Sequence, residues 1–195
     1  MEFALPTMQL LLLALLLIAL PLQVRCLHTI APTLTACSLG LLVHGEFFEY
    51  RCAGTGFPGS TSQQVIAEFE RRCGSDRVDV SFCRFKCAAE GGKWGYHGET
   101  HTETVEEFKA RAHHLVEWLC TELWPLVSCE GLAIVVAHQT LLDLLVQLLV
   151  DNTAENWEYG GAKHKMRNAD SIEVHAEATE GDMVPKFKVV GHSKV

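Results

Sequence analysis

A leucine-rich run near the start of the chain limits the possible folds more than any other segment does. Residues 8–22 read MQLLLLALLLIALPL, interrupted only by Gln9 and Pro21. The run is shorter than the ~20 residues that a helix needs to cross a bilayer. Its length is typical of the apolar centre of a secretory signal, but no Lys or Arg precedes Arg25. Two interpretations stay open: a signal peptide or short anchor, and an internal buried helix exposed by a missing upstream segment.

The rest of the chain has room for one domain. Its 195 residues, of which 48% are apolar and 21% charged, can build a single hydrophobic core. We expect a hydrophobic leader over 1–24, followed by one domain over 25–195. The net charge of −8 excludes nucleic acid as an expected partner, because counterion release needs a basic face. If Met8 to Leu22 is a targeting segment, the run could contact a membrane and the protein is secretory or membrane-associated; otherwise it is cytoplasmic.

The cysteines and histidines do not form a pattern typical of a metal site. Eight cysteines without compact spacing indicate ordinary buried thiols. Cys83 and Cys87 lack a second pair at the spacing of zinc ligands. His97-Gly-Glu-Thr-His101 is not the metalloprotease His-Glu-x-x-His arrangement. We therefore expect neither a metal nor a cofactor.

Apolar periodicity predicts helices that alternate with strands. Intervals of three or four residues from Val105 to Leu123 predict an amphipathic helix, with Glu103 in its acidic first turn. The apolar run 131–137 predicts a central strand buried on both faces, followed by a helix over 140–150. Further predictions are a helix over 25–39, a strand over 41–44, a helix from Thr61 to about Arg72, a short strand over 78–82, and a hairpin of 171–178 with 184–190.

His138 stands at a position where α/β sheets bind ligands. It follows the predicted strand directly, and a helix is predicted to begin one or two residues later. Free N–H groups at the start of such a helix attract an anion such as phosphate, and Gln139 with Thr140 suits this role. The local pattern alone leaves a simpler alternative open, in which His138 only forms a hydrogen bond with a loop carbonyl.

Five segments occur in an order that matches one known family. Their residues are 22–32 (LQVRCLHTIAP), 47–49 (FFE), 98–100 (GET) with Phe108-x-x-Arg111, 134–138 (IVVAH) and 168–174 (NADSIEV). They resemble, in this order, a Ser-Pro-Leu-x-Arg-(Ala/Cys)-x-x-Thr block, a Leu-x-Glu block, a Gly-Glu-(Ser/Thr) helix, a Val-(Val/Ser)-His-Gly block and an Asn-x-Ser strand. The family is the histidine phosphatase superfamily, also called phosphoglycerate-mutase-like.

The resemblance implies both a fold and a chemistry. The implied fold is α/β, a three-layer sandwich with a mostly parallel central sheet, incomplete at its N-terminus. The implied reaction is hydrolysis of a phosphomonoester through a phosphohistidine, without a cofactor. Arg25 and Gln139 would bind the phosphate. His138, as a catalytic residue, would donate a hydrogen bond to a phosphate oxygen, and Glu49 would protonate the leaving oxygen. The implied ligand is a phosphorylated small molecule or a phosphoprotein.

The chain departs from the family at the nucleophile. The family's Arg-His-Gly block lies upstream of the arginine that Arg25 matches, and residues 1–24 contain no histidine. The segment 41–46 (LLVHGE) resembles that block, with Val43 in place of the arginine, but it would then follow Arg25. The chain can thus be aligned with the family in two registers, one that begins at Arg25 and one that takes His44 as the nucleophile. We favour the first register, in which the nucleophile is missing, so we expect little or no phosphatase activity. The alternative is a non-enzymatic, secreted or membrane-tethered pseudo-phosphatase that binds phosphorylated ligands.

Overall fold

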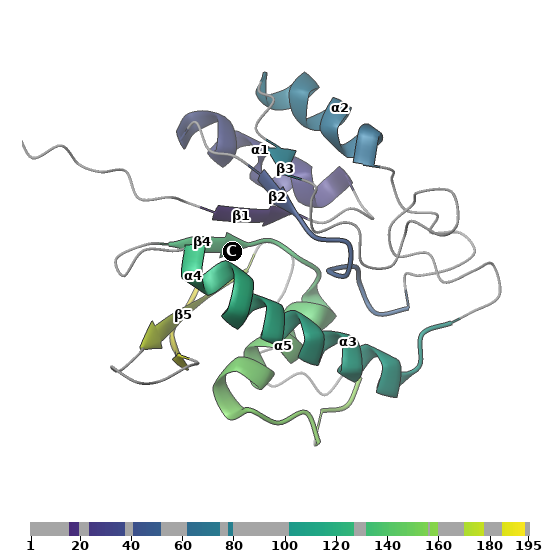
Figure 1. Cartoon of the computed structure of the whole chain (residues 1–195), viewed down its shortest axis with the longest axis vertical. Coiled ribbons are helices and arrows are strands. Elements are labelled where there is room, and N and C mark those ends of the chain that lie inside the picture. Colours follow the sequence, from purple (N-terminus) through teal and green to yellow (C-terminus); the bar gives the residue numbers. More distant parts are fainter. Residues whose placement is uncertain are drawn as a thin grey trace, which may run out of the picture.

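The computed structural model describes part of the chain, and the structural statements below refer to that part. The described residues are 16–19, 24–37, 41–51, 62–74, 78–79, 102–126, 132–155, 157–159, 170–177 and 185–193. The elements follow one another in the order β1 (Leu16–Ala19), α1 (Val24–Cys37), β2 (Leu41–Val43), α2 (Ser62–Cys73), β3 (Val78–Asp79), α3 (Val105–Trp118), the π-helix η2 (Leu119–Leu123), α4 (Trp124–Leu126), β4 (Ala133–Val135), α5 (Gln139–Asp151), β5 (Ser171–Glu177) and β6 (Lys186–Ser193) (Figure 1).

A small parallel sheet contains the first four strands. Its strand order is β3-β2-β1-β4, and every neighbouring pair is parallel. Leu17 is in register with Leu41 on one side and with Ile134 on the other. Part of the leucine-rich run therefore forms a strand between β2 and β4, and not the internal helix of the second interpretation. The leader over 1–24 stays a prediction. Within the described residues, no helix is long and apolar enough to span a membrane.

Two apolar clusters hold the helices against the sheet. Because successive strand residues point to opposite faces, Leu41 and Val43 of β2 belong to one cluster and Leu42 to the other. The first cluster contains α1 and α2 side chains, among them Leu34 and Phe69. The second is larger and consists mainly of residues from α3, η2 and α5. Figure 1 shows α1 beside α2, and α3 beside α5.

The predicted fold class is wrong. We expected one mostly parallel central sheet inside a three-layer sandwich, but the strands divide between two sheets. The parallel sheet has strands of only two to four residues, and β5 pairs with β6 in a separate antiparallel sheet. The residues of β5 and β6 are exposed or half-buried throughout. These two strands therefore lack the buried faces that a central strand needs.

The strand before His138 also differs from its prediction. The apolar run 131–137 was expected to be buried on both faces, whereas β4 covers only Ala133–Val135 and all three residues are half-buried. Among the described strands β4 pairs only with β1, so it lies at an edge of the parallel sheet. An apolar sequence alone does not distinguish an edge strand from a central one.

Most predicted helices are confirmed. α1, α2 and α5 agree with the predicted ranges to within about two residues at most ends. The predicted helix over 105–123 is present but changes from α-helix to π-helix at Leu119. Asn152 ends α5 in the left-handed conformation, with φ of 52°. The hairpin is confirmed as β5 and β6.

Candidate functional site

His138 lies between the end of β4 and the start of α5. It is the N-cap residue of α5, with extended backbone, and its carbonyl oxygen accepts a hydrogen bond of 2.8 Å from the N–H of Leu142. Its side chain is buried. Gln139, the first residue of the helix, is exposed. The sequence therefore located the strand-to-helix junction correctly, and it brings the imidazole to the amino end of a 13-residue helix.

The imidazole of His138 contacts the first turn of another helix. Nε2 of His138 lies 3.7 Å from Sγ of Cys26, and both side chains are buried. Cys26 is the third residue of α1, directly after Arg25. The side chain of Arg25 lies outside the described residues, so its predicted contact with phosphate stays a prediction. The backbone nevertheless brings the amino ends of α1 and α5 together at this contact.

Glu49 reaches the same end of α5. Its Oε2 accepts a hydrogen bond of 3.2 Å from the N–H of Thr140, and its Oε1 accepts one of 2.8 Å from the N–H of Tyr50. The first turn of a helix carries a partial positive charge, which attracts a carboxylate. Glu49 and His138, which are far apart in sequence, thus both lie at the start of α5.

The arrangement contains the groups that acid–base chemistry on an anion needs. An imidazole, a carboxylate and a thiol lie around the amino ends of two helices, where N–H groups and helix dipoles favour negative charge. We call Cys26, Glu49, His138 and Thr140 the candidate site. Within the described residues, no group of three or more His, Cys, Asp or Glu side chains could hold a metal ion. Cys83, Cys87, His97 and His101 lie outside the described residues.

His44, the histidine of the alternative register, has different surroundings. Its ring contacts those of Phe47 and Trp118, with centroid distances of 5.5 and 4.5 Å, and these two rings also contact each other. Its Nδ1 accepts a hydrogen bond of 3.2 Å from the N–H of Glu46. Burial lowers the pKa of His44 from 6.5 to about 4. The ring is therefore neutral near pH 7 and packs as part of the core.

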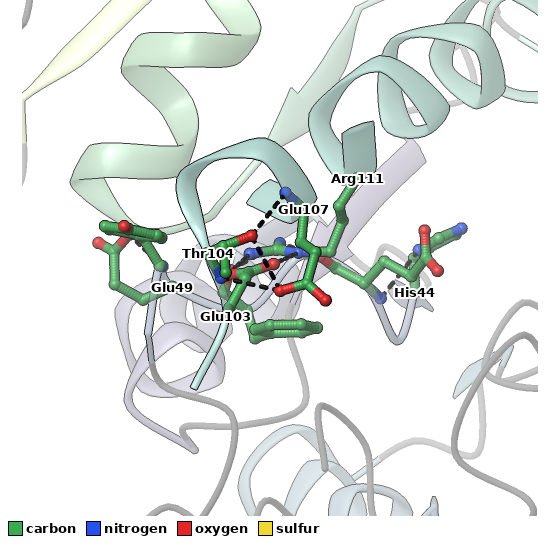
Figure 2. Close-up of polar contacts among 9 residues, drawn as sticks. His44, Glu49, Glu103, Thr104, Glu107 and Arg111 are labelled. Atoms are coloured by element: carbon green, nitrogen blue, oxygen red, sulfur yellow. Dashed lines mark hydrogen bonds and ion pairs between the residues drawn. The ribbon is translucent and has the colours of Figure 1, made fainter. Parts of the chain in front are cut away.

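Arg111, from the third resembling segment, lies in a second polar cluster. Its Nε and Nη2 donate to the two carboxylate oxygens of Glu103 at 2.7 and 2.8 Å. Its Nη1 donates to the carbonyl oxygens of Glu46 and Phe48 at 2.6 and 3.0 Å, and the guanidinium lies 3.7 Å from the centroid of the Phe48 ring. We call Glu46, Phe48, Glu103 and Arg111 the buried ion-pair cluster. It connects α3 to the segment after β2 (Figure 2).

Sequence reasoning missed the partner of Arg111. Glu103 was predicted to lie in the first helical turn, but it precedes the N-cap residue Thr104 and is buried against Arg111. The carboxylate that does receive the Thr104 backbone N–H is that of Glu107, in a capping box. The available signal in the sequence was an arginine that follows an acidic residue by eight positions, within the predicted helix. The resembling segment 98–100 lies outside the described residues.

Sequence reasoning also treated Cys26 as an ordinary thiol. Its only signal was its place next to Arg25, within a segment that resembles a phosphate-binding block. Comparisons of the chain with family models, with curated proteins and with solved structures find no match. The candidate site is therefore defined by the residues of this chain alone.

Proposed function

We propose that this chain binds phosphomonoester groups at the candidate site and has no phosphohistidine route of its own. The observation that carries the proposal is the meeting of His138 and Glu49 at the first turn of α5. The ligand class is a phosphorylated small molecule or a phosphoprotein. This corresponds to a pseudo-phosphatase that retains a binding site without the family's nucleophile.

The helix ends supply the first part of the affinity. A phosphate oxygen at the start of α5 can accept hydrogen bonds from backbone N–H groups and is favoured by the helix dipole. The imidazole of His138, when protonated, adds a charge-assisted donor. Arg25 lies one residue before Cys26, whose Sγ contacts His138. By the resemblance, Arg25 would bind two oxygens of the same phosphate.

Glu49 places a carboxylate at the helix end where the phosphate would bind. Its carboxylate already accepts the N–H of Thr140, so an incoming phosphate competes with an internal anion for the same helix end. A carboxyl group here can protonate the leaving oxygen of an ester, but only where a nucleophile attacks the phosphorus. His44, the histidine of the alternative register, packs in the core. Binding therefore fits this site better than phosphohistidine turnover.

Vanadate, an analogue of phosphate, tests the proposal through His138→Asn. Asparagine is a favoured N-cap residue, so this variant removes the imidazole and retains α5. We expect vanadate affinity to fall roughly 10- to 100-fold, the value of a hydrogen bond to a charged group. Isothermal titration calorimetry gives the Kd. The matched control is His114→Asn, at an exposed position of α3; equal Kd values for wild type and His138→Asn would contradict the proposal.

A chemical trap tests the second half of the proposal. After incubation with p-nitrophenyl phosphate, the protein is unfolded under basic conditions and searched for phosphohistidine by mass spectrometry. We expect none at any of the ten histidines. A stoichiometric phosphohistidine at His138 or His44 would show that the chain has a nucleophile of its own, and the binding-only interpretation would be wrong.

A further inference from the structure

Two buried cysteines of the chain differ in their surroundings but not in their exposure. Cys26 is 6% exposed and Cys120 is 8% exposed. Neither forms a disulfide. An external reagent therefore has similar access to either one, and any large difference in reactivity has to come from the groups around each sulfur.

The surroundings of Cys26 favour the thiolate. The sulfur lies in the first turn of the 14-residue helix α1, where the dipole stabilises negative charge. Nε2 of His138 is 3.7 Å from Sγ, which is sulfur hydrogen-bond distance, and in the tautomer that carries its proton on Nδ1 the imidazole accepts the thiol proton. A cysteine at a helix N-terminus next to a histidine is the environment in which proteins activate thiols.

The surroundings of Cys120 favour the thiol. Cys120 lies in η2, among buried apolar residues that include Leu119 and Leu123. Burial raises the pKa of the Cys120 thiol, because a charged sulfur would lose its hydration there. Cys120 is therefore an internal control for Cys26.

We propose that Cys26 is a site of reversible oxidation by hydrogen peroxide, with His138 as the base that activates it. His138 takes the thiol proton, and the thiolate sulfur attacks one oxygen of the peroxide. The S–O bond forms as the O–O bond breaks, and the leaving hydroxide takes the proton from the imidazolium to become water. Sulfur is oxidised by two electrons to a sulfenic acid and the peroxide is reduced. The low exposure of Cys26 suits an oxidant as small as hydrogen peroxide.

Oxidation of Cys26 would also regulate the candidate site, a step that rests on the proposed function. The added oxygen lies between the sulfur and His138, where it removes the 3.7 Å contact and occupies space beside the first turn of α5. We expect the sulfenic acid to weaken vanadate binding. A thiol reductant reverses the modification and restores the affinity.

The experiment compares the two cysteines within one protein. The full chain is exposed to hydrogen peroxide at pH 7, treated with catalase, unfolded in N-ethylmaleimide and analysed by mass spectrometry for the unmodified fraction of each cysteine. An ordinary thiol is only a few per cent ionised at pH 7, so we expect Cys26 to be lost about tenfold faster than Cys120. His138→Asn should reduce the rate at Cys26 to that of Cys120, while His114→Asn should not.

Equal rates at Cys26 and Cys120 in the wild-type protein would overturn the proposal. So would a rate at Cys26 that His138→Asn leaves unchanged while circular dichroism shows a folded protein. The oxidation rates do not depend on vanadate, so the two proposals fail separately. Rapid, His138-dependent oxidation without vanadate binding would leave this proposal standing and contradict the proposed function. Vanadate binding with equal oxidation rates at Cys26 and Cys120 would support the proposed function and overturn the oxidation proposal.

Discussion

The buried ion-pair cluster and the candidate site are both polar groups inside an apolar molecule, but they are bonded differently. In the first, Arg111 makes four hydrogen bonds of 2.6 to 3.0 Å to Glu103, Glu46 and Phe48. In the second, the contacts that join α1, α5 and Glu49 are 3.7 and 3.2 Å long. The buried ion-pair cluster therefore has the shorter contacts, and the candidate site has the longer ones.

The chemical types of the groups support the same distinction. A guanidinium keeps its proton at every relevant pH, so the buried ion-pair cluster has one stable arrangement. An imidazole, a thiol and a carboxylate each change charge within an accessible range. Arg111, from the third resembling segment, therefore binds within the fold, while the groups that can change charge lie in the candidate site.

The largest expected effect is that of Arg111→Met, which breaks the buried ion-pair cluster. The variant leaves the carboxylate of Glu103 buried without its cation, and we expect the free energy of unfolding to fall by about 3–5 kcal/mol. Urea denaturation measures it. Adding Glu103→Leu should recover part of the loss, because no unpaired charge then remains. A loss below about 1 kcal/mol for the single variant would mean that this cluster does not hold the fold.

The next effect is a pH dependence from His44, whose neighbour Glu46 belongs to the buried ion-pair cluster. The pKa of His44 is about 4 in the folded chain, against an ordinary value of 6.5. Between these values the unfolded chain binds more protons, so the free energy of unfolding falls as the pH is lowered from 6.5 to 4. The full loss is about 3 kcal/mol.

His44→Asn isolates this contribution. The asparagine side chain can still accept the N–H two residues later, as His44 does from Glu46, but it does not titrate. Urea denaturation at pH 4.5 and pH 7 should show a smaller difference for the variant than for the wild type. If the difference in the free energy of unfolding between the two pH values were the same in both proteins, the pH dependence would come from groups other than His44.

Thr104→Ala should have an intermediate effect, because it loosens the start of the helix that carries Arg111. Thr104 forms a capping box with Glu107, in which each side chain accepts the other's backbone N–H. We expect a loss of about 1 kcal/mol in the free energy of unfolding. Thr121→Ala is the matched control, since its hydroxyl only donates to Glu117 within the helical stretch. Equal losses for the two variants would show that the capping box does not stabilise α3.

The smallest effect on stability is expected for Glu49→Gln in the candidate site. The amide oxygen can still accept the N–H of Thr140, while the charge at the start of α5 is lost, at a cost of roughly 0.3–1 kcal/mol. Vanadate should bind more tightly, by roughly three- to tenfold, because the competing negative charge is gone. Weaker binding would show that Glu49 supports the anion rather than competing with it.

The helices could be predicted from the sequence, because each has its own local signal. Periodic apolar residues predicted α3, and a strongly apolar run directly after a strand predicted α5. A Thr61–Gln64 spacing predicted the start of α2 at Ser62. Strand pairing could not be predicted in the same way, since it joins segments far apart in sequence. The hairpin of β5 and β6 was found, but its separation from the parallel sheet was not, because that depends on which faces the rest of the chain can bury.

The candidate site was predicted in part. The resemblance selected His138 and Glu49 together, and the structure does bring both to the first turn of α5. The resemblance did not select Cys26, which lies 112 positions from His138. The reactivity of a thiol depends on the groups that the fold places around it, and the sequence does not show these. The same reason applies to Glu103, whose importance depends on the buried guanidinium of Arg111.

The place of β1 in the sheet has a consequence for folding during synthesis. Leu16 pairs with Ala133 and Leu17 with Leu41, so one side of this early strand can pair soon after it emerges and the other only after most of the chain has been made. Parallel pairings between distant segments form slowly, and an apolar strand edge that waits for its partner invites association with other chains. The rate at which β4 reaches β1 should therefore determine how much of the newly made protein folds and how much aggregates.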